Sequence, residues 1–405
     1  MTSTTNAGRF TVLLCLLAAI CEGIDLQAAG VAAAGIVPLF KPAPSVLGSF
    51  FAASTLGLFI GAVLGGRLAD RMGRRFVLIY SIVAFGIFSL LTAFAWDMQS
   101  LTWARFFTGL GLGGALPMVM TMVPEASGAG RRTANTAIAY AGLPIGGSIV
   151  SGIAFLSGPA QWHLIFIVGG ILPLVLAVVM LMRLKESPEF TALQAANKNA
   201  SGAAAQAGSL LQILAQGRAL RTVLLWISFF LALIILYLLL NWLPTLLKDI
   251  GMTGEQAAFA QIIFNVGGAV AALSMGSLLV GRWRMPSLIA VFIAVPVMLY
   301  VLSVIGTDFL IANVVVFLLG LAVLALQAFL YATAPASYPT WIRGVGVGAA
   351  IAIGRLGSVV GPKLGGWLKG LGHGSSQLLI DLLPIAIIGS VFALILALNK
   401  PKDPG

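Results

Sequence analysis

The amino-acid sequence predicts an all-α membrane protein of twelve transmembrane helices, arranged as two pseudo-symmetric six-helix bundles. Three observations lead to this prediction: the composition, the recurrence of long apolar stretches, and the distribution of Lys and Arg. Of the 405 residues, 60% are hydrophobic and 9% are charged, and the mean hydropathy is +1.05. An ordinary soluble domain has about 25% charged residues. The composition therefore excludes such a domain and indicates lipid as the surrounding solvent.

Apolar stretches of about 20 residues, the length that crosses a bilayer as a helix, recur along the whole chain. The predicted spans are residues 10–37, 46–66, 76–95, 99–121, 133–156, 162–182, 221–246, 256–280, 286–305, 309–333, 344–368 and 378–398. Glu22 and Asp25 interrupt the first stretch, which is not typical of the apolar core of a cleaved signal peptide. The first stretch is therefore predicted to remain as a helix.

Lys and Arg gather on one side of the predicted spans. If the N-terminus lies inside, only Lys41, Lys248 and Lys369 fall in outer segments, a few basic residues fall within spans, and all the others fall in inner segments. The positive-inside rule then predicts that both termini are cytoplasmic. The same asymmetry accounts for the net charge of +11. The basic excess therefore does not indicate nucleic-acid binding, because no basic patch with interleaved aromatic residues accompanies it.

A polar segment, residues 184–220, divides the chain. It is rich in Ala, Gln, Asn, Gly and Ser and predicts a cytoplasmic central loop between an N-terminal bundle (1–183) and a C-terminal bundle (221–405). The two halves echo each other: "PEASGAGRR" and "GLPIGG" in the first have counterparts in "YPTWIRG" and "GPKLGG" in the second, at nearly equal separations. Such spacing indicates an internal repeat. Repeated membrane halves are typical of transporters with a central site at the interface of the repeats.

The stretch "GGRLADRMGRR", residues 65–75, lies between the second and third spans. Glycine allows close helix approach and a tight turn, and the carboxylate can bind a helix N-terminus or an arginine. The stretch resembles the signature loop of the major facilitator superfamily. The resemblance implies a cytoplasmic gate formed by Gly66, Asp70, Arg71, Gly73, Arg74 and Arg75, in which such a contact latches the two halves. The alternative is a plain turn in a positive inner loop. The equivalent loop of the second half, "GSLLVGRWR", lacks the Asp.

The stretch "LTWARFFTGLGLGG", residues 101–114, places Arg105 inside the fourth span. A lone arginine at this depth is costly unless it faces a cavity or a carboxylate; the alternative is that it reaches out to the membrane surface. The stretch resembles a second motif of the same superfamily. Glu125, Arg131 and Arg132, which follow this span, resemble the cytoplasmic charge network of the superfamily and are assigned to the same gate.

Two carboxylates stand at mid-depth in the first span, within "CEGIDLQAAG". Glu22 and Asp25 are three residues apart and are expected to share one helix face. Two nearby carboxylates in a medium of low dielectric constant cannot both ionise cheaply, so at least one is expected to hold a proton near neutral pH, as a proton carrier must. In proton-coupled members of the superfamily an acid on the first helix pairs with an arginine on the fourth. Asp25 and Arg105 occupy matching places. The alternative is a permanent ion pair that only orders the helices.

A cation in the eleventh span points to the charge of the substrate. Arg355 lies within "GRLGSVVGPKLGG", and a guanidinium binds a carboxylate through two hydrogen bonds. The alternative is that Arg355 pairs with a backbone carbonyl or another helix. Lys363, nearer the outer end, is expected to reach the membrane surface. Candidate substrate-binding residues with Arg355 are Tyr140, Tyr237, Asn241, Asn265 and Gln327. A cation, a few amides and several rings would suit an aromatic acid.

The acidic pair also carries a closer resemblance. "CEGIDLQAAG" is similar to the first-helix signature of the aromatic acid:proton symporter family, and Glu22 in place of the usual Asp is shared by a subgroup resembling 3-(3-hydroxyphenyl)propionate transporters. "NWLP" at 241–244 and "GRLG" at 354–357 also resemble that subgroup. The resemblance implies a multi-pass protein of the bacterial inner membrane. Such a protein imports a hydroxyphenylpropionate or hydroxybenzoate type of acid with a proton, through Asp25, Glu22, Arg105 and Arg355. A monomer is expected because no span offers a clear dimer face beyond the glycines used internally.

Other functions were weighed against this one. A symporter for another organic acid or a sugar and a proton-coupled drug exporter remain alternatives, since Arg355 favours an anion but not a ring. An enzyme should show a clustered nucleophile, base or metal set, and none is found. Neither Cys15 and Cys21 nor His163 and His373 have a metal-binding cluster around them. We therefore expect a transporter with no metal and no cofactor, using the proton as its coupling ion.

Overall fold

The computed structural model describes residues 6–187, 190–191, 213–215, 217–278, 282–339 and 342–399. Within these ranges the chain folds into long α-helices joined by short turns. The helices of the first half are α1 (Asn6–Phe40), α2 (Pro44–Met72), α3 (Arg74–Ala93), α4 (Met98–Leu112), α5 (Ala115–Ala126), α6 (Arg132–Ser157) and α7 (Trp162–Arg183). Those of the second half are α10 (Ala219–Ile250), α11 (Gly254–Leu278), α12 (Arg284–Val304), α13 (Phe309–Ala336), α14 (Arg343–Gly370), α15 (Ser375–Asp381) and α16 (Leu383–Leu398).

The predicted number of spans is confirmed: the described part of the chain holds twelve segments long and apolar enough to cross a membrane. Two of them are not single helices. The fourth span is interrupted between α4 and α5 at Gly113 and Gly114. A Cβ at Gly113 would lie 2.3 Å from the backbone nitrogen of Ala62 in α2, so this glycine permits a close approach that another residue would prevent. The twelfth span consists of α15 and α16.

Local sequence signals set several helix ends. Asp97 begins α4 with a capping box, because its carboxylate accepts a 2.7 Å hydrogen bond from the backbone of Ser100, whose hydroxyl bonds back to the backbone of Asp97. Asp308 caps α13 in the same manner, accepting from Ile311 at 3.0 Å. At the end of α10, Gly251 adopts a left-handed conformation (φ 118°) that suits glycine. These caps fix where α4 and α13 begin and where α10 ends.

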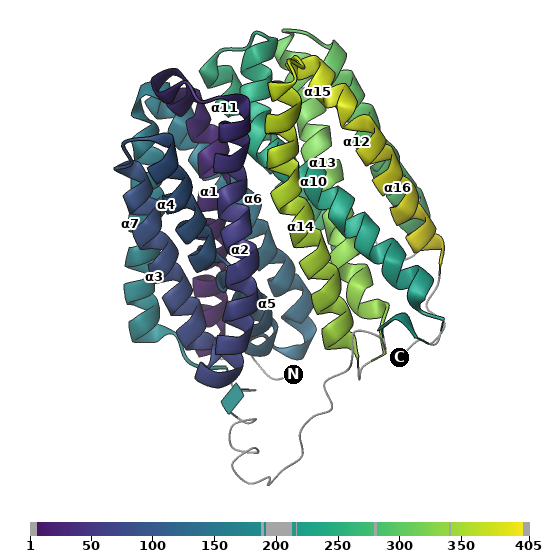
Figure 1. The fold of residues 1–405 in the computed structure, drawn as a ribbon. Coiled ribbons are helices and arrows are strands. Elements are labelled where there is room, and N and C mark those ends of the chain that lie inside the picture. The colour runs from purple at the N-terminus through teal and green to yellow at the C-terminus, as the bar shows by residue number, and fades with distance from the viewer. Residues whose placement is uncertain are drawn as a thin grey trace.

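The two halves stand side by side and repeat the same packing (Figure 1). In the first half α1 packs against α6 and α2 against α4, and in the second half α10 packs against α14 and α11 against α13. The halves meet through α2 against α14 and α6 against α11, with α1 also touching α10. This pairwise correspondence is what the internal repeat of the sequence predicts.

Glycines repeat at the closest helix contacts as well. A Cβ at Gly57 of α2 would lie 2.0 Å from the carbonyl oxygen of Phe106, and a Cβ at Gly267 of α11 would lie 2.2 Å from that of Phe317. Small residues let helix backbones approach closely in a membrane, where the hydrophobic effect does not drive helix association. The two positions perform the same packing task in the two halves.

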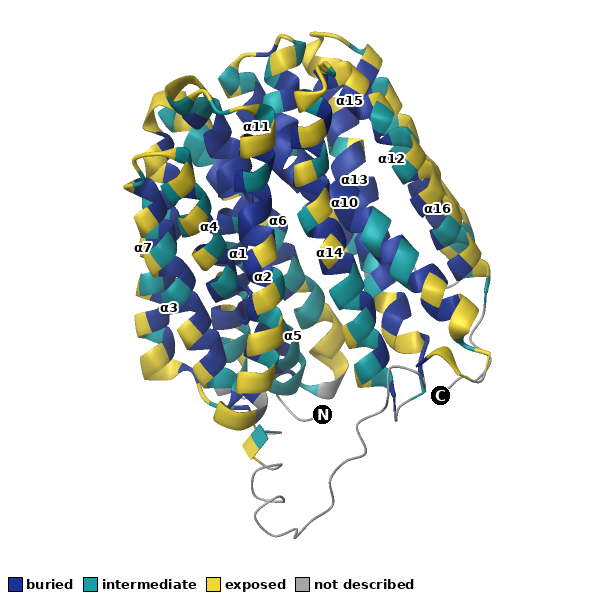
Figure 2. Cartoon of the chain, viewed as in Figure 1, coloured by how far each residue is buried: buried dark blue, intermediate teal, exposed yellow. Residues whose placement is uncertain are grey.

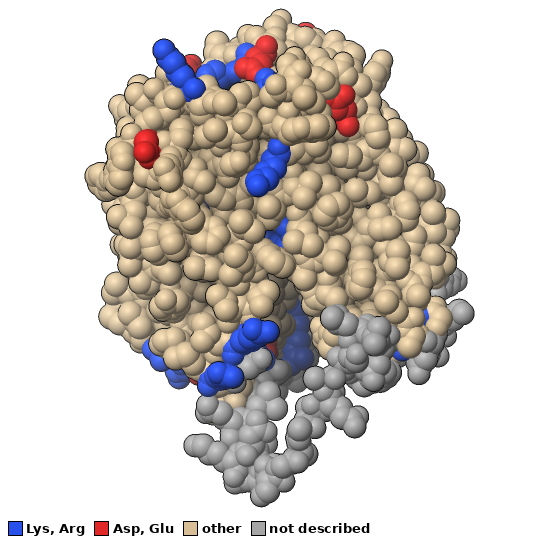
Figure 3. Space-filling view, in the orientation of Figure 1, with Lys and Arg blue, Asp and Glu red and all other residues tan. Residues whose placement is uncertain are grey.

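Exposed residues lie on the outward faces of the helices, and buried residues lie on the faces between them (Figure 2). Many exposed side chains are large and apolar, including Leu156, which is 84% exposed, and Leu310, which is 74% exposed. In the view of Figure 3, Lys, Arg, Asp and Glu gather near the two ends, and most of the surface between the ends carries no charge. An apolar belt between polar ends fits a chain surrounded by lipid. The protein is a multi-pass membrane protein.

The predicted central loop, residues 184–220, lies mostly outside the described residues. Helix α7 ends at Arg183 and α10 begins at Ala219, close to the predicted limits of the two bundles. Helix α1 begins and α16 ends at the same end of the molecule, the lower end in Figure 1. That this end faces the cytoplasm stays a prediction from the Lys and Arg distribution.

The close contact at Gly57 can be tested by one methyl group. In Gly57→Ala the new Cβ meets backbone atoms of α4 that cannot move aside, so we expect a loss of about 1–3 kcal/mol of stability and a lower melting temperature in detergent. Gly152→Ala in α6 is the matched control, because a Cβ there meets nothing within 4 Å. An equal response of the two variants would show that the α2–α4 approach does not limit stability.

Candidate functional site

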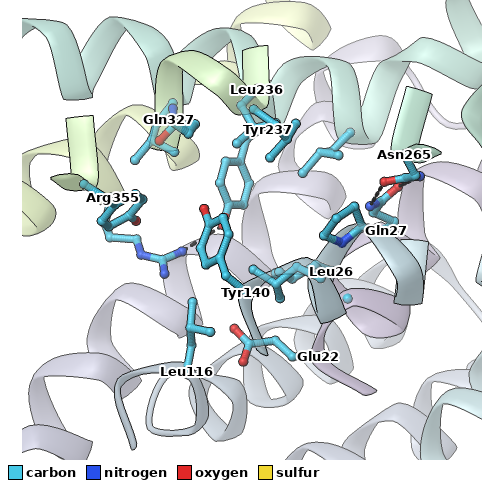
Figure 4. Close-up of a pocket in the computed structure, with 17 residues that line it drawn as sticks. Glu22, Leu26, Gln27, Leu116, Tyr140, Leu236, Tyr237, Asn265, Gln327 and Arg355 are labelled. Carbon is cyan, nitrogen blue, oxygen red and sulfur yellow. Dashed lines mark hydrogen bonds between the residues drawn. The ribbon is translucent and has the colours of Figure 1, made fainter. Parts of the chain in front are cut away.

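A pocket lies between the two halves, about midway along the helices. Its walls come from α1, α5 and α6 of the first half and from α10, α11, α13 and α14 of the second. The empty space within it, including the part open to solvent, is about 620 Å³. Figure 4 shows the side chains that point into it. Because the site is built from both halves, its shape changes when the halves move relative to each other.

Asp25 and Arg105 form the predicted ion pair. Arg105 Nη1 donates to Asp25 Oδ1 at 2.7 Å, and both side chains are fully buried. Arg105 Nη2 donates to the backbone oxygen of Asp25 at 2.8 Å and to Ser54 Oγ of α2 at 3.2 Å. The guanidinium also lies 5.7 Å from the ring centre of Phe166. Arg105 therefore joins α1, α2 and α4 and does not reach out to the membrane surface.

Glu22 and Asp25 lie in different surroundings, although they are one helical turn apart. Asp25 is held by Arg105 and does not line the pocket, whereas Glu22 is a wall residue of the pocket. Glu22 is 1% exposed, and its Oε2 has no hydrogen-bond partner among the described residues. Figure 4 shows its carboxylate pointing into the space between the halves. The expected common face is thus divided between an ion pair and an open carboxylate.

Arg355 supplies positive charge from the opposite wall. It is 9% exposed, and its Nη1 donates to the Tyr237 hydroxyl of α10 at 2.8 Å. Glu22 of the first half and Arg355 of the second line the same pocket. A guanidinium has five N–H donors, and the described residues give that of Arg355 one hydrogen bond. The alternative weighed for Arg355 was a backbone carbonyl or another helix, and Tyr237 of α10 is such a partner on another helix. The role of Arg355 in binding an anion stays a prediction.

Aromatic rings form the middle of the pocket. The ring of Tyr140 meets that of Tyr331 edge to face at 6.0 Å between centroids, and Tyr331 meets Phe229 at 5.2 Å. Tyr140 comes from α6 and Tyr331 from α13, so this contact joins the two halves. Edge-to-face geometry is favourable for aromatic pairs. A flat ring of a ligand could pack against the same aromatic side chains.

Gln327 of α13 lines the pocket and is fully buried. Neither its Nε2 nor its Oε1 has a hydrogen-bond partner among the described residues. A buried amide without partners costs about 1–3 kcal/mol, so such a group in a pocket calls for a ligand or water. Gln327 thus lies at the pocket, and its part in substrate binding stays a prediction.

An amide cluster closes the side of the pocket nearer the end of α1. Gln27 of α1 donates to Asn265 Oδ1 of α11 at 2.7 Å and accepts from Asn265 at 2.8 Å and from Gln261 at 2.9 Å. All three side chains are buried. A Cβ at Gly147 would lie 2.0 Å from Gln27 Nε2, so this glycine makes room for the cluster. The cluster joins α1 of the first half to α11 of the second.

The halves are also in close contact further along the same side. A Cβ at Gly30 of α1 would lie 2.7 Å from Asn241 of α10, and one at Gly48 of α2 would lie 3.0 Å from Gly366 of α14. At the opposite end Figure 3 shows a furrow between the halves, with Lys and Arg side chains in it. The structure is therefore closed above the pocket and more open below it.

One predicted binding residue is placed elsewhere. Asn241 does not line the pocket; its Nδ2 donates to the backbone oxygen of Tyr237 at 2.8 Å, and its backbone packs against Gly30. The assignment of Asn241 to substrate is therefore corrected: in this structure it belongs to the contact of α1 with α10. Periodicity could not separate the two faces of α10, because this helix is apolar almost all round.

The charged loop binds within the first half. Arg74 pairs with Glu125 of α5, and Glu125 accepts from the hydroxyl of Ser187. Glu186 accepts hydrogen bonds of 3.1 Å from the backbone nitrogens of Arg74 and Arg75, capping α3. Arg75 Nη2 donates to the backbone oxygen of Leu181 at 2.8 Å. The recorded partners thus tie α3 to α5 and to the end of α7, and not to the second half.

The remaining gate residues divide by their surroundings. Gly73 has φ 97° and makes the turn between α2 and α3. Gly66 faces open space, and it is Gly65 that approaches Gly114 of α5, so the close helix contact lies one residue earlier than expected. The exposed members are Arg71, Arg131 and Arg132. The side chain of Asp70 lies outside what the structure describes.

Several residues that shape the site were not predicted. Gln27, Gln261 and Ser54 are polar side chains buried within apolar spans, and polarity at that depth is itself a signal. Glu186 follows the sixth span, at the start of the predicted central loop, and was assigned no role. No group of three or more His, Cys, Asp or Glu able to hold a metal is found in the described part of the chain.

A family model for the Major Facilitator Superfamily matches residues 15–362. The chain is 36% identical to a 3-(3-hydroxyphenyl)propionate transporter of Escherichia coli (strain K12), covering 99% of this chain and 96% of that protein. It is 33% identical to a 4-hydroxybenzoate transporter of Pseudomonas aeruginosa, covering 97% and 93%. Among solved structures, a partially occluded inward-open xylose transporter from E. coli matches with a TM-score of 0.74 and 16% identity, covering 98% of this chain and 100% of that chain. This last likeness concerns the fold alone.

The ion pair of Asp25 and Arg105 can be tested by a double-mutant cycle. Arg105→Met leaves a buried carboxylate unpaired, which costs about 3–5 kcal/mol, whereas Asp25→Asn with Arg105→Met removes both charges. We expect the double variant to melt at a higher temperature than Arg105→Met alone, with Arg131→Met at an exposed position as the control. Additive losses of melting temperature would contradict a direct pair.

Proposed function

The chain belongs to the major facilitator superfamily of membrane transporters, and we propose that it imports an aromatic carboxylate together with a proton by alternating access. The observation that carries the proposal is the pocket between the halves, where the guanidinium of Arg355 lies beside aromatic rings. The bacterial relatives that it resembles over nearly its whole length are named for hydroxyphenylpropionate and hydroxybenzoate. The proposed location is the bacterial inner membrane.

The chemistry of the pocket supports an acid with a ring. Arg355 can bind a carboxylate through two parallel N–H donors, and Tyr237 holds the guanidinium in place through its hydroxyl. Tyr140 and Tyr331 offer ring faces and edges to a flat substrate. A sugar carries neither a carboxylate for Arg355 to bind nor a flat ring to pack against the tyrosines.

Proton coupling is proposed to involve two carboxylate–guanidinium relations. Asp25 is bound by Arg105, and protonation of Asp25 would weaken that pair and free α1 from α4. Glu22 faces Arg355 across the pocket, so an ionised Glu22 competes with the substrate carboxylate for the same cation. A proton on Glu22 would release Arg355 to the substrate. Protonation and anion binding would then favour each other, as symport requires.

The energetics favour such a scheme. An anion moved into a cell with a negative interior works against about 2.3 kcal/mol per charge at 100 mV. One proton moved with the anion cancels this electrical work and leaves the pH gradient as the driving force. In the proposal the proton is the coupling ion, no cofactor takes part, and one chain suffices.

Alternating access is proposed as a change in which end of the pocket is closed. In this state the amide cluster of Gln27, Gln261 and Asn265 and the contact at Gly30 join the halves on one side. The charged loop at the other end is engaged within its own half. When the halves rock, the first contacts would separate, and the charged loop would be free to meet the second half.

Uptake into proteoliposomes tests substrate and coupling together. We expect an inward proton gradient to drive accumulation of 3-(3-hydroxyphenyl)propionate, and Asp25→Asn to abolish that response. Asp97→Asn, which changes an exposed carboxylate at the start of α4, is the control and should retain it. Glucose and benzoate are tested in parallel. Uptake of glucose but of no aromatic acid would refute the substrate class, and unchanged proton dependence in Asp25→Asn would refute its role.

The role of Arg355 predicts a change in substrate affinity. Arg355→Lys keeps the charge but loses the planar two-donor contact and the bond to Tyr237, so we expect KM for the acid to rise about ten-fold or more. Lys363→Gln, an exposed cation on the same helix, should leave KM unchanged. Equal effects of the two substitutions would mean that α14 contributes only a general positive field.

A further inference from the structure

We propose that Gln327 recognises the ring hydroxyl of the substrate and thereby makes the transporter selective for phenolic acids over the same acids without a hydroxyl. This inference rests on the proposed function, since it names a chemical feature of the substrate that the same pocket would take. Gln327 is fully buried in α13, lines the pocket, and has no partner for either amide atom in the described part of the structure.

Three other polar side chains of the pocket, Arg355, Asn265 and Gln27, have recorded hydrogen bonds. Arg355 is bound to Tyr237 and faces Glu22. Asn265 and Gln27 satisfy each other across the two halves. Gln327 differs from them because it has both a donor and an acceptor at the pocket, and neither forms a hydrogen bond with the described residues. Figure 4 shows its amide on the wall formed by the second half.

The chemistry of an amide decides which group of the substrate fits it. A carboxylate only accepts hydrogen bonds, so it would satisfy Nε2 and leave Oε1 without a partner. A phenolic hydroxyl donates and accepts, so one hydroxyl can satisfy either atom and a hydroxyl with an ordered water can satisfy both. Since Arg355 supplies the cation for the carboxylate, Gln327 is left for the hydroxyl end.

The position of Gln327 on α13 places it beside an aromatic wall. Tyr331 follows it by four residues and lies on the same helix face, and both line the pocket. A ring that packs against Tyr331 would therefore carry its substituents past Gln327. The two relatives named above act on acids that have a hydroxyl on the ring, which matches this arrangement.

A site with a buried polar group rejects an analogue that leaves this group unpaired more strongly than it rejects a small change in apolar size. Without a hydroxyl on the ring, the amide of Gln327 would stay desolvated and unsatisfied. From the typical cost of such a group we expect the unsubstituted acid to be disfavoured by about ten-fold or more in kcat/KM. Replacing the amide by an apolar side chain removes the penalty and so removes the preference.

The experiment compares uptake of 3-(3-hydroxyphenyl)propionate with that of 3-phenylpropionate in proteoliposomes. The proteins are the parent, Gln327→Met, which keeps the length of the side chain, and Gln327→Leu. Asn313→Leu is the matched control, a buried amide on the same helix outside the pocket. We expect the ratio of kcat/KM values to favour the hydroxylated acid about ten-fold or more in the parent and the control, and to fall towards one in both Gln327 variants.

Other outcomes would overturn the inference in distinguishable ways. If the Gln327 variants lose uptake of both acids equally, the ratio is unchanged and the amide assists the carboxylate or the fold. If the parent itself shows no preference, Gln327 does not read a hydroxyl. If the parent carries neither acid while it carries another solute, the proposed substrate class fails and the inference fails with it.

Discussion

The ion pair between Asp25 and Arg105 is the interaction on which the rest of the site depends. Both groups are fully buried, and in a medium of low dielectric constant neither could stay charged without the other. Arg105 also binds the backbone of α1 and the hydroxyl of Ser54, so the pair fixes the rotation of α1 against α2 and α4. With α1 held in this way, Glu22 faces the pocket.

The separation of the two carboxylates gives them different chemistry. Asp25 is neutralised by a direct contact within the first half, whereas Glu22 and the cation of the second half, Arg355, both line the pocket. The carboxylate of Asp25 thus affects how the helices of the first half pack together. The other bears on whether Arg355 is available to an anion. The interaction of Asp25 with Arg105 and that of Glu22 with Arg355 both depend on protonation of the carboxylate. Through them, proton binding could change the affinity for an anion without direct contact between proton and anion.

Sequence reasoning succeeded where the free-energy cost of placing a residue in an apolar span could be judged from that residue alone. It failed where the role of a residue depends on the partners it meets in the fold. Arg105 and Arg355 were found because a cation in an apolar span must have a reason to be there. Asn241 was expected to line the pocket and Gly66 to make a close helix contact, and the structure places neither so, since neighbouring positions on one helix face different partners. Asn241 packs at Gly30, and Gly65 takes the close contact expected of Gly66. The amide cluster of Gln27, Gln261 and Asn265 is formed by two helices far apart in the chain, so no local pattern announces it.

The sequence by itself determined the twelve spans, the internal repeat and the presence of buried charges, because each follows from the cost of placing a residue in lipid. The pair of Asp25 and Arg105 was already expected from the resemblance to the superfamily. Only the tertiary structure set Arg355 beside Tyr237 and left the amide of Gln327 without a partner among the described residues, because such contacts depend on the packing of helices from distant parts of the chain. The cost of placing a residue in lipid can be judged for each residue separately, whereas a binding site forms only when helices from distant parts of the chain pack together.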